Sequence, residues 1–192
     1  MPVTRFLAAA ILSIFILLAP VRAQAPAESV QPIEYVGVVE VPGVSASELF
    51  VRAKVWFADT FVDSKHVLEV QDKDAGVLAG KGSIHFVPHF LVARDLVAGE
   101  VTFNIKVLVK DGRFKYMFTD FVHRGTPSSM AAPIDFGLLT TAKNPPDVKN
   151  IPKGNREKAW DELHQLVEAH ATLAIAQLKQ QMAAAPGGNS NW

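Results

Sequence analysis

The residues GEVTFNIKVLVKDGRFKYMFTDFVHR, Gly99 to Arg124, decide the fold of this chain. Two runs rich in Val, Phe, Ile and Tyr flank Asp111-Gly112, which is a strong signal for a two-residue hairpin turn. A loop of that length fixes the register of the two strands. The expected pairs are Lys110 with Arg113, Val109 with Phe114, Val107 with Tyr116, and Ile105 with Phe118.

Strand side chains alternate between two faces, so this hairpin has two different sides. One side is wholly apolar and needs a cover, while the other is mixed and can face water. The apolar side contains Val101, Phe103, Ile105, Val107, Val109, Phe114, Tyr116 and Phe118. The mixed side is expected to contain Asn104, Lys106, Leu108, Lys110, Arg113, Lys115, Met117, Thr119 and Phe121.

The first 23 residues have the pattern of a signal peptide. Arg5 precedes an apolar run of about 15 residues, shorter than the roughly 18–20 of a membrane-spanning helix. Val21-Arg22-Ala23 then fits a cleavage site. We therefore expect export to the periplasm or the cell exterior, with membrane contact only transiently through residues 1–23. The alternative is an uncleaved membrane anchor.

The composition excludes further classes of function. The chain has no cysteine, which excludes disulfides, thiol catalysis and thiolate metal sites. Cleavage would leave a chain with a net charge of about −2, which gives no electrostatic reason to bind nucleic acid. No cofactor is expected.

We predict one α+β domain over residues 33–183, after a flexible leader at 24–32. Its first strand is Ile33–Val41. A capping box at Ser45 and Glu48 then starts a helix. The stripe of that helix contains Leu49, Ala53, Trp56, Phe57 and Phe61, with Arg52, Lys54 and Asp59 largely outside it.

Two more strands, Val67–Gln71 and Val77–Val87, are expected to form a second hairpin. The second of them places Gly80 and Gly82 on its apolar side, where a helix backbone could approach the sheet. Lys81, Ser83 and His85 lie on the other side.

Residues 125–155 form a long loop without clear periodicity, whose middle is pinned by apolar side chains. A helix follows at 156–183, capped by Asn155, and a disordered tail at 184–192. The pinning residues are expected to be Ile134, Phe136, Leu138 and Leu139. The stripe of the last helix is expected to contain Trp160, Leu163, Val167, Ala171, Ala174 and Leu178, widened by Leu166, Leu173 and Ile175.

The order is therefore strand, helix, four strands, helix, an antiparallel curved sheet with helices on one face. The segments VVEVPGVSASELFVRAKVWFADTF, VLEVQDKDAGVLAGKGSI and VKDGRFKYMFTDF resemble an exported bacterial family, chiefly from Bacteroidetes. That family is a domain of unknown function with a fold like that of the TATA-binding protein, and the resemblance covers roughly Ile33 to Val122. It implies the same fold and brings no activity or site residue.

No pattern of catalysis or metal binding stands out. His85 and His89 are interrupted by Pro88, and with Asp120 or His123 as the nearest further ligands they do not form a metal site. We interpret these histidines as surface or edge residues. Ser83 and His85 share a strand face, but no nucleophile-elbow motif is present. We therefore expect a protein that is not an enzyme.

The mixed sheet face is the best candidate for function. We expect it to bind an unknown protein, an envelope component or a small anionic ligand, unless it is simply hydrated. The alternative is a periplasmic carrier that holds a small apolar ligand between sheet and helices, gated by residues 125–155. The candidate binding residues are Lys81, Ser83, His85, Asn104, Lys106, Lys115 and Met117.

Overall fold

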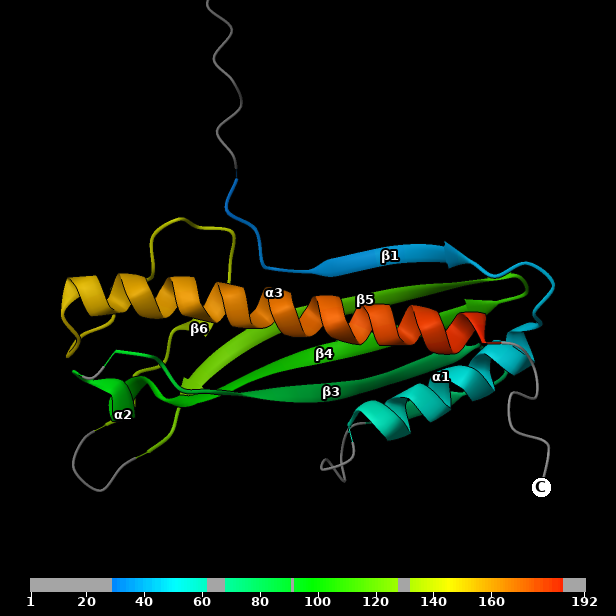
Figure 1. Cartoon of the computed structure of the whole chain (residues 1–192), viewed down its shortest axis with the longest axis horizontal. Helices are drawn as coiled ribbons and strands as arrows, with labels where there is room; N and C mark the ends of the chain where they lie inside the picture. The colour runs from blue at the N-terminus through cyan, green and yellow to red at the C-terminus, as the bar shows by residue number, and fades with distance from the viewer. Residues whose placement is uncertain (1–28, 62–67, 91, 128–131, 185–192) are drawn as a thin grey trace, which may run out of the picture.

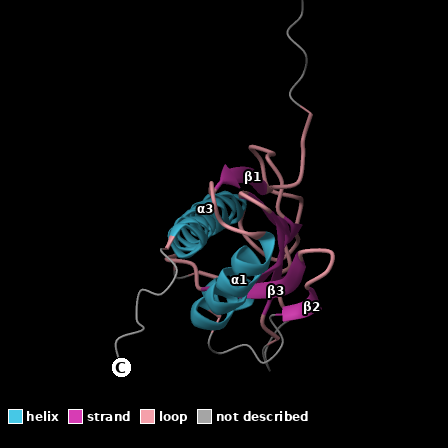
Figure 2. Ribbon diagram, turned by 90° about the vertical axis from the view of Figure 1, so that its right-hand side faces the viewer, coloured by secondary structure: helices cyan, strands magenta, loops and turns pink. Residues whose placement is uncertain are grey.

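An antiparallel sheet with two long helices on one face makes up the part of the chain that this computed structural model describes, residues 29–61, 68–90, 92–127 and 132–184 (Figures 1 and 2). The predicted α+β class is confirmed. The predicted signal peptide, part of the leader and most of the tail lie outside the described residues. The elements are β1 (Tyr35–Glu40), α1 (Ala46–Thr60), β2 (Leu68–Asp72), β3 (Val77–Phe86), α2 (Arg94–Val97), β4 (Gly99–Lys110), β5 (Arg113–Gly125), β6 (Gly137–Leu138) and α3 (Lys153–Ala183).

The central hairpin has the predicted register. All four expected pairs of β4 and β5 are present, and the turn is Asp111-Gly112, with Gly112 at φ +74°. A positive φ is the conformation that glycine adopts at little cost in such turns. The strands follow one another in the order β1-β5-β4-β3-β2, and β6 pairs with the far end of β5.

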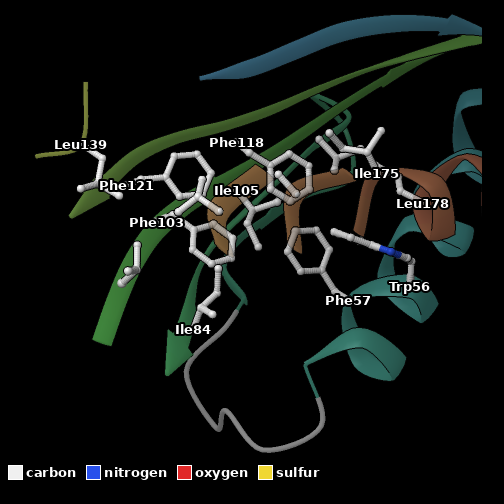
Figure 3. Close-up of a cluster of buried hydrophobic side chains, with 14 of the residues drawn as sticks. Trp56, Phe57, Ile84, Phe103, Ile105, Phe118, Phe121, Leu139, Ile175 and Leu178 are labelled. Atoms are coloured by element: carbon white, nitrogen blue, oxygen red, sulfur yellow. The ribbon is translucent and has the colours of Figure 1, made fainter. Parts of the chain in front are cut away.

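The core lies between the sheet and the two helices. Trp56 and Phe57 of α1 point toward the rings of β4 and β5, and α3 adds Ile175 and Leu178 (Figure 3). The Trp56 and Phe118 ring centroids are 6.2 Å apart. Together α1 and α3 cover the apolar side of the hairpin, and each helix also contacts the other.

Ser45 caps α1 as predicted, but the Glu48 carboxylate pairs with Arg52 rather than with the backbone N–H of Ser45. The place of Arg52 also differs from its prediction. Ser45 Oγ accepts a hydrogen bond from the backbone N–H of Glu48 at 3.2 Å. Arg52 was expected outside the stripe and is instead 5% exposed. Its Nη1 donates to the carbonyl of Met182 at 2.6 Å and its Nε to Glu48 at 3.0 Å. Since the last carbonyls of a helix lack partners within the helix, Arg52 joins the end of α3 to α1.

The last helix begins three residues before its predicted start. Pro152 occupies the N-cap position, and Asn155 instead donates from Nδ2 to the carbonyl of Val92. The residues of the predicted stripe are buried or, like Ala174, half-buried, with one exception. Leu173 was wrongly included, because it is 58% exposed on the outer side of the helix.

A β-bulge in β5 changes one face assignment. Asp120 has a φ of +57°, and the register shifts between Thr102 and Asn104 of β4. An extra residue in one strand turns the next side chain to the other face. Phe121, predicted on the mixed face, is therefore fully buried, with its ring 5.1 Å from that of Phe103.

Two glycines make room for aromatic rings rather than for a helix backbone. A Cβ at Gly82 would lie 2.3 Å from the ring of Phe103, on the neighbouring strand. A Cβ at Gly37 would lie 2.4 Å from the hydroxyl of Tyr116. Phe103 thus occupies the space that was expected to receive a helix at Gly82.

The segment expected to be a long loop is fastened to the sheet. Its strand β6 pairs with β5, and Ile134 N donates to the carbonyl of Leu96 at 2.8 Å. Ile134, Phe136 and Leu139 are buried as predicted, whereas Leu138 is 41% exposed. Leu138 was misassigned because it lies in β6, where neighbouring side chains point to opposite faces.

Candidate functional site

All seven candidate residues lie on the open face of the sheet, opposite the helices. The pairing of β3, β4, β5 and β1 arranges this face in rows that run across the strands. From the hairpin end the rows are Lys110, Arg113 and Glu40; Val77, Leu108, Lys115 and Val38; Ala79, Lys106, Met117 and Val36; and Lys81, Asn104 and Thr119. Ser83 and His85 follow on β3, opposite Thr102 and Glu100.

The two middle rows are mainly apolar and, with one residue of β2, reach all five strands of the main sheet path. We call this set the apolar band: Val36, Val38, Val70, Val77, Ala79, Leu108 and Met117. Val38 is 60% exposed, Val70 47% and Val36 43%. Contiguous exposed apolar surface on a sheet is typical of interaction sites, whereas isolated exposed residues are ordinary.

The row of Lys81 and the residues beyond it are largely satisfied within the protein. Lys81 Nζ lies 3.1 Å from Glu69 Oε1. Ser83 Oγ donates to Glu100 at 3.0 Å, and Asn104 Nδ2 donates to Asp120 at 2.8 Å. Lys81, Ser83 and Asn104 therefore have acidic partners, which weakens their candidacy as ligand-binding groups.

The hairpin end is different, because its cations have no such partners. We call Lys106, Lys110, Arg113 and Lys115 the basic group. None of their side chains forms an ion pair or hydrogen bond with another of the residues that the structure describes. Asp111, the acid of the turn, accepts instead from the backbone N–H of Ala46 at 2.7 Å. Glu40 lies opposite Arg113 without forming a salt bridge.

A shallow hollow of about 260 Å³ lies where the apolar band meets the basic group. Val38 and Leu108 supply apolar surface, and cationic side chains stand around it. We call it the hairpin-end hollow, and its lining residues are Val38, Leu108, Lys110, Arg113, Phe114 and Lys115. An apolar surface with charges at its edge suits a ligand that has one apolar part and one anionic part.

His123 is not a surface residue, contrary to the prediction. Its ring is fully buried between Phe86 and Phe136, with centroids 5.5 Å from each. Nε2 lies 3.0 Å from the carbonyl of Val97 and must donate to it, while Nδ1 accepts from the N–H of Phe136 at 3.3 Å. Burial lowers the pKa of His123 from 6.5 to about 4, despite opposing effects of the Val97 carbonyl and Asp135.

Two further histidines, His89 and His164, make separate contacts. His89 Nδ1 lies 3.1 Å from Glu162, and the two ring nitrogens of His164 lie 2.7 and 2.8 Å from the carbonyls of Trp160 and Thr140. Within the described residues, no group of three or more His, Asp or Glu side chains is placed to hold a metal ion. The same residues include no helix that is long and apolar enough to cross a membrane.

Comparisons with known proteins agree with this architecture. Residues 35–124 match the family described as a domain of unknown function (DUF4468) with a TBP-like fold. No curated protein matches the sequence.

Two solved structures show the same fold at low sequence identity. One is a DUF4468 family protein from Bacteroides ovatus, with a TM-score of 0.52 and 12% identity over 80% of this chain and 88% of that one. The other is a TBP-like protein from Parabacteroides distasonis, with a TM-score of 0.54 and 13% identity over 77% and 93%. The predicted resemblance is thus confirmed: residues 35–124 are similar to the DUF4468 family, which is described as a domain of unknown function with a TBP-like fold.

Proposed function

We propose that this chain is an exported, non-catalytic binding module that receives an anionic, partly apolar partner on the open face of its sheet. One observation supports this above all others. The apolar band and the basic group lie side by side on that face, and the four cations have no partner among the described residues. Burial of apolar area favours association, and the unpaired positive charge selects a partner of negative charge.

The charge around the band favours an acidic partner over a second copy of the chain. Lys106 and Lys115 lie within the apolar rows, and Lys110 and Arg113 border them. Two such faces pressed together would place cations against cations, which costs free energy. An acidic partner would instead neutralise the positive charge of the same residues.

The open face gives no support to catalysis. Ser83 Oγ donates directly to the carboxylate of Glu100, so the hydroxyl is not held by a histidine base. A serine nucleophile requires a base within hydrogen-bond reach, itself oriented by a third group. Binding is therefore the simpler use of this face.

The carrier alternative has less support. Such a carrier would need an apolar cavity of several hundred Å³ between the helices and the sheet. The described core instead brings rings together there, with the Phe103 and Phe118 centroids 6.2 Å apart and Trp56 only 2% exposed.

Export rests on the sequence of residues 1–23. The protein recovered from the periplasm or medium should begin at Gln24 when its N-terminus is sequenced. Recovery of the intact chain solely from the inner membrane would contradict export.

Site-specific photo-crosslinking tests the docking face. A benzoylphenylalanine at Val36, in the apolar band, should give a discrete adduct in cells that make the protein. The same probe at Leu173, which is also exposed but lies on α3, serves as the control. Equal adducts at both positions, or none at Val36, would contradict the proposal.

A further inference from the structure

We propose that the hairpin-end hollow binds a soluble, single-chain anionic amphiphile, a short acyl chain that ends in a carboxylate or phosphate. The inference deepens the proposed function and rests on it, because it names the ligand class for one end of the open face. The shape of the hollow, its lining and the uncompensated charge around it lead to this ligand class.

The shape favours a small ligand. Typical pockets for drug-sized molecules measure about 300–1,000 Å³. The hollow, at about 260 Å³, lies just below that range. It is recessed, whereas binding to a bilayer surface relies on apolar side chains that protrude into the lipid. A single short chain can occupy such a recess.

The lining supplies a place for each end of the ligand. Lys115 stands between Leu108 of β4 and Val38 of β1 in one row, so the carbon stem of the lysine adds to the apolar surface. Arg113 lies in the next row, opposite Lys110. A guanidinium group can hold a carboxylate or phosphate through two parallel hydrogen bonds, which a lysine cannot do.

The rim keeps a net positive charge despite its acidic neighbour. Three cations line the hollow, and Glu40 faces only Arg113 in the register. Asp111, one residue from Lys110, is engaged with the start of α1. An anionic head group would therefore meet cations that the described residues leave uncompensated.

Titration with sodium decanoate, below its micellar concentration and at low salt, tests the inference. The methyl NMR signals of Val38 and Leu108 should shift in a saturable, one-to-one manner. Lys110→Gln with Arg113→Gln should weaken decanoate binding about tenfold or more, because both head-group contacts are lost. Lys149→Gln with Lys158→Gln, the same charge change at exposed and distant positions, should leave binding unchanged.

Two further probes separate the ligand from its alternatives. Decyltrimethylammonium has the same chain with a cationic head and should not bind. Equal binding of both amphiphiles, no shift with decanoate, or binding only to phosphatidylglycerol vesicles would overturn the inference. If decanoate fails while the crosslink at Val36 persists, the docking face stands and its partner is an acidic protein segment instead.

Discussion

At the scale of single residues, the burial of His123 makes the stability of the fold depend on pH. The neutral ring accepts from Phe136 N–H and donates to the Val97 carbonyl, so it joins three separate segments of the chain. Protonation would convert the Nδ1 acceptor into a donor that faces another donor. The folded state therefore disfavours protonation of His123, in agreement with its lowered pKa.

Acid should thus destabilise the fold through His123. Its pKa is about 4 in the folded protein and has the ordinary value of 6.5 in the unfolded chain, so this stability is fully present above about pH 6.5 and is lost as pH falls toward 4. Between pH 7 and pH 5 the loss should be about 2 kcal/mol. Urea unfolding of the wild type and of His123→Leu at both pH values measures it.

The variant will be less stable at pH 7, since it leaves the Val97 carbonyl and Phe136 N–H without their partner. Its free energy of unfolding should nevertheless change less between the two pH values. Equal pH dependence in both proteins would show that His123 does not titrate in this range.

Arg52 is a second residue that contacts a segment distant from it in the sequence. Arg52→Met keeps the length of the side chain but removes its hydrogen bonds to Met182 and Glu48. We expect a loss of about 1.5–3 kcal/mol, as for hydrogen bonds made by charged groups. Hydrogen exchange should accelerate in the last turn of α3. Lys54→Met, an exposed change on the same helix, is the control and should alter neither quantity.

The sequence contains a signal for the burial of Arg52. Arg52 lies three residues after Leu49 and four before Trp56, which places it on the apolar side of α1. A charge at such a position implies a buried partner. The identity of that partner, the carbonyl of Met182, could not be predicted, because it depends on how α3 lies against α1.

At the scale of elements, the β4–β5 hairpin was predictable and its bulge was not. The Asp111-Gly112 turn and alternating residues define the register up to Thr119. Beyond it, the spacing of three from Phe118 to Phe121 breaks the alternation. Aspartate tolerates a positive φ better than most residues, so Asp120 is the natural place for the extra residue.

Strand glycines give a test of packing at this scale. Gly82→Ala should cost about 1–3 kcal/mol, because the new methyl group would collide with the ring of Phe103. Gly154→Ala, in the first turn of α3, meets nothing within 4 Å and should be neutral or stabilise the protein by up to about 1 kcal/mol. Thermal unfolding compares them, and equal effects would show that the Phe103 ring moves freely aside.

At the scale of the whole molecule, one face of the sheet is covered by α1 and α3 and the other is open (Figure 2). The alternation of apolar and polar residues predicted this division. The rows of the open face could not be predicted in full, because they depend on pairings between β1 and β5 that are distant in the sequence. The acids that satisfy Lys81, Ser83 and Asn104 could not be predicted either, since Glu69, Glu100 and Asp120 approach them only in the folded sheet.

The open face also makes the final prediction. Replacing Lys106 and Lys115 together by Gln should change the free energy of unfolding by no more than about 0.5 kcal/mol for each site, because neither lysine has a described ion-pair partner. Binding to an anionic partner should weaken, and the difference from wild type should be larger at low salt, where charges are least screened. Chemical denaturation and binding measured at two salt concentrations check both effects.

The pair Lys149→Gln and Lys158→Gln controls for net charge. Unfolding of the Lys106 and Lys115 variant would mean that these lysines stabilise the sheet, whereas unchanged binding at both salt concentrations would place the partner elsewhere on the molecule.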